Sequence, residues 1–236
     1  ISLEDQSQYR QSQLFNVNNA AGAFAGDAAS YLAGRGSGVN NYAGVQVPDI
    51  VGQVRVDQAW GLFQVAAAAH QVRASYYVPT DETSGHPGDK WGYAVMAALS
   101  LKNLPTGAGD SINVDAVYAD GASRYVIGGT TLNTFSMFGG SGLAYQSVAF
   151  GAAADGIFAN NGGIETTKAW GIRGAFNHNW NQNWATSLFG SYSSLEYSSQ
   201  GKAWYTAALQ NKLGTGVTGN PDFNIIQIGT RTAWTP

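Results

Sequence analysis

"VPDIVGQVRVDQAWGLFQVAAAAHQV", residues 47–72, alternates between apolar and polar side chains over most of its length. Within residues 50–57 the even-numbered residues are apolar or glycine. The odd-numbered residues include the polar Gln53, Arg55 and Asp57. Successive side chains of a β-strand point to opposite faces, so this period of two predicts a strand with one face in an apolar environment and one in water. The alternation resumes after a short turn near Trp60, which predicts an antiparallel partner.

The same alternation recurs along the chain. It predicts eight strands, one partial at residues 1–6 and seven at 50–57, 63–69, 91–101, 111–120, 170–176, 184–192 and 226–234. The predicted connections alternate in length, with short ones at 59–61, 103–109 and 179–183 and long polar ones at about 7–41, 78–90, 121–166 and 198–221. Short turns at one end of a sheet and long loops at the other are typical of bacterial outer-membrane barrels.

The composition limits the class of protein. Only 11% of the residues are charged, against about 25% in soluble domains, and 31 glycines and many neutral polar residues take their place. No apolar run approaches the roughly 18 residues that a spanning helix needs, which argues against a helical membrane protein. A net charge of -3 without a basic block argues against a nucleic-acid partner. The absence of cysteine excludes a disulfide scaffold and a Cys-based zinc site.

Two folds accommodate alternating strands, a soluble β-sandwich and a membrane barrel. A sandwich normally carries charges on its outer face, whereas the polar faces here carry mainly Gln, Asn, Ser, Ala and Gly. In lipid, an open sheet edge leaves backbone amides without partners at several kcal/mol each, so spanning strands close into a barrel. The composition therefore favours a barrel over a sandwich, and we predict an all-β protein, an antiparallel transmembrane β-barrel.

On this interpretation the polar parity faces a wet lumen and the apolar parity faces lipid. The predicted pore-lining residues are Gln53, Arg55, Asp57, Gln64, His70, Asn113, Asp115, Arg173, Asn177, Gln227 and Arg231. Tryptophans that lie at or near strand ends are expected to form interfacial girdles. These are Trp60, Trp91, Trp170, Trp184 and Trp234.

Two longer stretches carry a resemblance to a known family. Residues 47–61, "VPDIVGQVRVDQAWG", and 167–193, "TKAWGIRGAFNHNWNQNWATSLFGSYS", resemble the general porins of alphaproteobacteria, of the rhizobial type. The opening "ISLEDQSQYR" and the final "IGTRTAWTP" resemble internal strands of the same family. The resemblance implies a 16-stranded barrel, usually a homotrimer, in the bacterial cell outer membrane. Such a barrel passes ions and small hydrophilic solutes passively and contacts outer-membrane lipid and lipopolysaccharide.

The chain departs from that family in its number of strands. With about eight, it is expected to be an internal portion of a longer porin, a single but incomplete barrel domain with long external loops at about 7–41, 121–166 and 198–221. The inward-folded loop that narrows the family's pore is expected to lie outside this chain. Eight strands closed alone would enclose a lumen filled by side chains.

Other chemistry has little support in the sequence. His70, His86 and His178 lie far apart, and neither an HExxH nor a CxxC motif is present. No G-x-S-x-G motif marks a nucleophile, and the acidic loop residues lack the spacing of a calcium loop. We therefore predict no catalytic residue, no metal site and no cofactor. Two alternatives to a diffusion channel stay open: a surface barrel that binds a partner through its long loops, as an adhesin does, and, less favoured, a barrel hydrolase.

Overall fold

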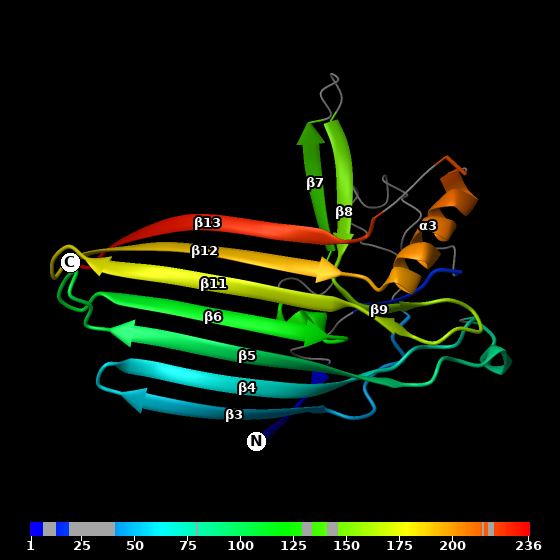
Figure 1. Ribbon diagram of the computed structural model, residues 1–236, viewed down its shortest axis with the longest axis horizontal. Helices are drawn as coiled ribbons and strands as arrows, with labels where there is room; N and C mark the ends of the chain where they lie inside the picture. Colours follow the sequence, from blue (N-terminus) through cyan, green and yellow to red (C-terminus); the bar gives the residue numbers. More distant parts are fainter. Residues whose placement is uncertain are drawn as a thin grey trace.

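The computed structural model describes residues 1–6, 13–18, 41–78, 80–128, 134–140, 146–213, 215–216 and 220–236. Its main feature is an eight-stranded antiparallel sheet whose strands lie side by side (Figure 1). In spatial order these are β1 (Ser2–Glu4), β3 (Asp49–Gln58), β4 (Gly61–Val72), β5 (Lys90–Lys102), β6 (Ser111–Asp120), β11 (Lys168–Asn179), β12 (Trp184–Glu196) and β13 (Phe223–Trp234). All eight predicted strands are present, which confirms the all-β antiparallel fold.

The main sheet is open within the described part of the chain. Strand β1 pairs with β3 only and β13 pairs with β12 only, so these two strands form the opposite edges. None of the helices in the described ranges has both the length and the apolar character needed to cross a membrane.

The two ends of the main sheet differ in their connections. The tight turns between β3 and β4, β5 and β6, and β11 and β12 gather with the C-terminus at one end, on the left of Figure 1. We call this the short-turn end. The long connections leave the sheet at the other end, where helix α3 (Ser199–Leu213) also lies, and we call this the long-loop end. The predicted alternation of short and long connections is therefore confirmed.

A buried carboxylate organises the short-turn end. Asp110, in the turn between β5 and β6, accepts hydrogen bonds from Asn179 N at 3.0 Å, from Thr106 Oγ1 at 2.7 Å and from His178 Nδ1 at 2.8 Å. These donors, the Asn179 amide first, lower the pKa of Asp110 to about 2. Asp110 thus joins the β5–β6 turn to the end of β11.

The predicted long loops contain secondary structure of their own. The elements are β2 (Gln13–Asn16), η1 (Glu82–Ser84), η2 (Ser123–Tyr125), β7 (Thr134–Gly140), β8 (Gln146–Ala152), β9 (Ala154–Phe158), β10 (Glu165–Thr166) and α3. Strands β10, β9 and β2 form a three-stranded sheet, and β7 and β8 form a hairpin that rises away from the main sheet (Figure 1). Every residue of β2 and β9 is buried.

The three-stranded sheet and η2 pack against one face of the main sheet. A single apolar cluster joins Phe15 of β2 and Ile157 of β9 to the wall residues Ala68, Val117 and Leu195. The wall residues of this cluster share a parity with the predicted lumen residues. We call the face of the main sheet that carries these residues the inner face. The strands of the main sheet, seen from this face with its polar side chains, are called the wall. Part of the predicted external loop 121–166 therefore folds onto the inner face.

The opposite, outer face is apolar and exposed. Its exposed residues include Val54 at 65%, Ile226 at 76% and Ile228 at 83% exposure. A protein surrounded by water would bury such a continuous set of large apolar side chains, because each gains about 1.5–3 kcal/mol on leaving water. An apolar outer face opposite a polar inner face is the arrangement of a spanning barrel wall.

Candidate channel wall and inner cavity

The first strands of the wall carry hydrogen-bonded polar side chains. Arg55 Nε donates to Asp57 Oδ2 at 2.7 Å along β3, and about half of each side chain is exposed. Gln64 Nε2 of β4 donates to Gln53 Oε1 at 3.0 Å across the strand pair. These side chains can meet because the strands are pleated. The pleat brings alternate residues of β3 and their partners on β4 to the same face of the sheet.

A second charged pair crosses from β6 to β11. Arg173 lies directly opposite Asp115 in the register, and its Nε donates to Asp115 Oδ1 at 2.8 Å. Half of the Arg173 side chain is exposed, as is about a third of that of Asp115. The pair therefore lies on the inner face as a solvated charge pair.

Neutral polar contacts continue the wall toward β13. Ser191 Oγ donates to Gln227 Oε1 at 3.1 Å. Asn177 Nδ2 donates to Ser111 Oγ at 3.1 Å. Arg231 of β13 is exposed opposite Ser187 and has no ion-pair partner in the described ranges.

Each of the eleven predicted pore-lining residues lies on the inner face by strand register. They are Gln53, Arg55 and Asp57 on β3, Gln64 and His70 on β4, Asn113 and Asp115 on β6, Arg173 and Asn177 on β11, and Gln227 and Arg231 on β13. His70 differs from the rest in its environment. It is 1% exposed and lies beneath β9, so its imidazole contacts protein groups instead of solvent.

A cavity of about 350 Å³ lies between the wall and the inward-folded segment. The wall contributes Gln53, Gln64 and Arg173, and the segment around η2 contributes Arg124 and Tyr125. Arg124 and Tyr125 were not among the predicted site residues. No local signal places them at the wall, because they belong to a long connection whose fold depends on distant contacts.

Five of the seven tryptophans, those expected to form girdles, lie in two belts on the apolar side of the main sheet. At the short-turn end are Trp60, Trp184 and Trp234, with the rings of the last two 6.3 Å apart between centroids. Near the long-loop end are Trp91 and Trp170, and Trp170 lies 5.0 Å from the ring of Tyr192. All five tryptophans are between 43% and 59% exposed.

The spacing of these belts suits a bilayer. Trp170 pairs with Ser194, ten residues beyond Trp184 on β12 (194 − 184 = 10). At about 3.3 Å per residue, ten residues span about 33 Å along the strand. A strand tilt of about 40° shortens this to about 25 Å along the membrane normal, which is the height of the apolar band of outer-membrane barrels. The separation of the two belts along β12 is therefore of the same order as the height of that band.

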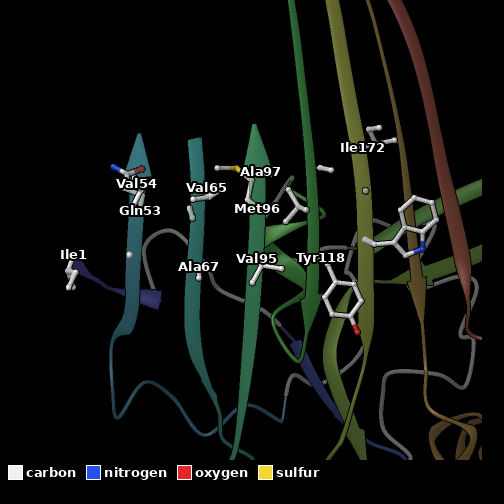
Figure 2. Close-up of a pocket in the computed structure, with 16 residues that line it drawn as sticks. Ile1, Gln53, Val54, Val65, Ala67, Val95, Met96, Ala97, Tyr118 and Ile172 are labelled. Atoms are coloured by element: carbon white, nitrogen blue, oxygen red, sulfur yellow. The ribbon is translucent and has the colours of Figure 1, made fainter. Parts of the chain in front are cut away.

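Small residues form a shallow groove in the outer face. Figure 2 shows the site, in which Val54, Val65, Ala97 and Ile172 come from β3, β4, β5 and β11. The groove has a volume of about 960 Å³, and Gly52, Ala67, Ala97 and Ala116 contribute to its lining. Because glycine and alanine have no long side chains, the sheet surface is lower here than at its rim.

The described residues contain no group of three or more His, Cys, Asp or Glu side chains arranged to hold a metal ion. Searches among curated proteins and among solved structures find no match to the chain. A family model described as the porin subfamily matches residues 1–236. With a polar wall, an apolar outer face and two tryptophan belts, the chain belongs to the porin subfamily.

Proposed function

We propose that the inner face of the main sheet lines the aqueous passage of this outer-membrane porin. Ions and small hydrophilic solutes would cross it by passive diffusion, without a catalytic step. The observation that carries the proposal is the contrast between two faces of the same strands. Arg55, Asp115 and Arg173 are solvated on the inner face, whereas Val54, Ile226 and Ile228 are exposed on the outer face.

The predicted pore-lining residues form the wall of this proposed passage, with His70 beneath the inward-folded segment. The cavity beside Arg124 and Tyr125 would be its narrow part, because there the segment faces Gln53, Gln64 and Arg173 across about 350 Å³. A porin needs no acid, base or nucleophile for diffusion, so we assign the exposed residues of this wall to solute contact and exclude the buried His70 from it. Membership of the porin subfamily favours this channel over a surface-binding barrel.

The open edges of the main sheet support a larger barrel. In lipid, each backbone amide on the outer edge of β1 or β13 that lacks a hydrogen-bond partner would cost several kcal/mol of folding free energy. Further strands between these edges would satisfy them, and the family resemblance suggests 16 in total. The wall would then enclose a lumen wider than eight strands allow.

For assembly, we propose a homotrimer in which a neighbouring copy covers the outer groove. Gly52, Ala67, Ala97 and Ala116 leave room for the side chains of a second barrel to approach closely. The remaining outer face would contact lipid, with lipopolysaccharide at the long-loop end. The same resemblance supports an alphaproteobacterial, rhizobial-type porin of a Gram-negative outer membrane.

Single-channel recording tests the channel directly. The purified protein, reconstituted in a planar bilayer, should give stepwise conductance that increases with KCl concentration. Liposomes that contain it should swell in small sugars and not in large ones. A folded, inserted protein without conductance would contradict the proposed passage.

A further inference from the structure

A histidine between two carboxylates joins the wall to the inward-folded segment. His70 Nδ1 lies 2.8 Å from Asp49 Oδ1, and His70 Nε2 lies 3.1 Å from Asp155 Oδ2. Asp49 and His70 belong to the wall strands β3 and β4, whereas Asp155 belongs to β9. Both carboxylates are fully buried, and His70 is almost so. We call these three residues the tether.

The hydrogen bonds around the tether define its charges. Asp49 also accepts from Gln6 Nε2 at 2.6 Å and from Tyr125 Oη at 2.7 Å. Asp155 Oδ1 accepts from the amide of Ser123 at 2.7 Å and from its hydroxyl at 2.9 Å. Each ring nitrogen of His70 faces a carboxylate oxygen, and an oxygen of this kind accepts, so both nitrogens donate and the imidazole carries a positive charge.

The surrounding groups keep the tether dry. Tyr42 lies beside the ring of His70, at 6.5 Å between centroids, and its hydroxyl donates to Gln6 Oε1 at 3.0 Å. Burial first, and then the nearby carboxylates, raises the pKa of Tyr42, so its phenol stays protonated. An ion triad in such a dry site is held strongly, because removal of one member leaves a buried charge unpaired.

The tether holds residues that face the proposed narrow part of the passage. Tyr125 hydrogen-bonds to Asp49 and lines the cavity beside Arg124. Ser123, two residues before it, is bonded to Asp155. Release of the tether would therefore remove the buried hydrogen bonds that link η2 and β9 to β3 and β4, and would leave the apolar cluster and every wall strand in place.

We propose that Asp49, His70 and Asp155 hold η2 and β9 at a set distance from the wall and thereby set the width of the passage. This inference rests on the proposed function. His70 acts here as a positioning residue, because it contacts the segment and the wall but not the solute.

The test compares His70→Ala with His86→Ala, the same substitution in a loop outside the tether. We expect His70→Ala to raise single-channel conductance and to admit larger sugars, and His86→Ala to behave as the wild type. If the wild type itself does not conduct, the proposed function fails. If it conducts and His70→Ala leaves conductance and sugar cut-off unchanged, the tether is overturned and the function stands.

A cross-link separates positioning from general stability. A Cβ added at Gly171 of the wall would lie 3.3 Å from Val126 Cγ1, next to η2, and the chain has no native cysteine. Three substitutions are added to His70→Ala: Gly171→Cys, Val126→Cys and Ser193→Ala. The last removes a hydroxyl that would lie 2.8 Å from the new Cβ. We call these three substitutions the cysteine set. Oxidation should return conductance toward the wild-type value and reduction should raise it again.

The same cysteine set with native His70 is the control and should respond little to oxidation. The proposal is wrong if oxidation lowers the conductance of the His70→Ala protein with the cysteine set and that of the control by the same amount. It is also wrong if oxidation lowers the conductance of neither protein. Should His70→Ala not fold, Tyr125→Phe decides. It removes only the hydroxyl that bonds Asp49 and should still raise conductance, whereas a wild-type value would contradict the proposal.

Discussion

Arg173 and Asp115 face each other across β11 and β6, with a guanidinium nitrogen 2.8 Å from a carboxylate oxygen on the inner face. The pair is nearly neutral as a whole, and Arg55 and Asp57 repeat the arrangement on β3. A passing ion therefore meets balanced charges on this wall, which favours weak selectivity. Removal of one partner would leave the other to act alone on ions in the lumen.

Substitution of Arg55 and Arg173 together by glutamine should shift permeability toward cations, because Asp57 and Asp115 are then unpaired. The shift should be larger at low salt, where the Debye length exceeds its roughly 8 Å at physiological ionic strength. Reversal potentials under a KCl gradient measure it. Asp115→Asn should shift selectivity toward anions, and Arg173→Lys, which keeps the charge, should change it least. If the cation-to-anion permeability ratio of the double variant is unchanged at low salt, both arginines have only a structural role in the wall.

Neighbouring residues on β3 should respond oppositely to charge. Val54 is exposed on the outer face, so Val54→Arg should destabilise the folded protein by about 2–4 kcal/mol if it lies near the bilayer centre. Arg55 lies on the solvated inner face, so Arg55→Ala should change stability little. Folding into lipid vesicles, followed by urea titration, compares the two. Equal tolerance of arginine at positions 54 and 55 would contradict the assignment of faces.

Acid should weaken the turn at the short-turn end. The folded-state pKa of Asp110, about 2, lies below its ordinary value, so its contribution to stability is present above about pH 4. That contribution is lost as the pH falls toward 2. Asp110→Asn should therefore be less stable than the wild type near neutral pH, and the difference should vanish near pH 2. Unfolding curves at several pH values provide the measurement, and a difference that persists at pH 2 would rule out the carboxylate as its source.

Filling of the outer groove should block assembly. Ala116→Phe places a large ring where the groove is lined by small residues, and a second barrel could no longer approach. Native mass measurement in detergent should show fewer trimers than for the wild type. Leu188→Phe, an exposed outer-face substitution outside this groove, is the matched control and should leave trimers intact. Monomers alone in the wild type would remove the trimer proposal.

Strand positions and faces could be predicted because they are local. The side-chain period of two is a property of each strand, so Arg55 and Val54 are assigned to opposite faces from residues 50–57 alone. The same reasoning places Asp115, Arg173 and Gln227 on the inner face, where the register has them. Turn lengths then separate the two ends of the main sheet.

The inward-folded segment could not be predicted this way. Asp155 meets His70 over a separation of 85 residues, and Tyr125 meets Asp49 over 76. Their connection reads as a Gly-rich external loop, because buried hydrogen bonds between distant residues leave no periodic pattern. The packing of η2 and β9 on the inner face is therefore visible only in the tertiary structure.

The sequence by itself determined which strands form and which side of each meets water, because both follow from alternation along a few residues. Only the tertiary structure decided whether His70 is exposed to water or buried. Its parity places it on the inner face among Gln64 and Gln53, yet β9 covers it and two carboxylates bind it. The physical reason is that burial and charge pairing depend on long-range contacts, which no short stretch of sequence encodes alone.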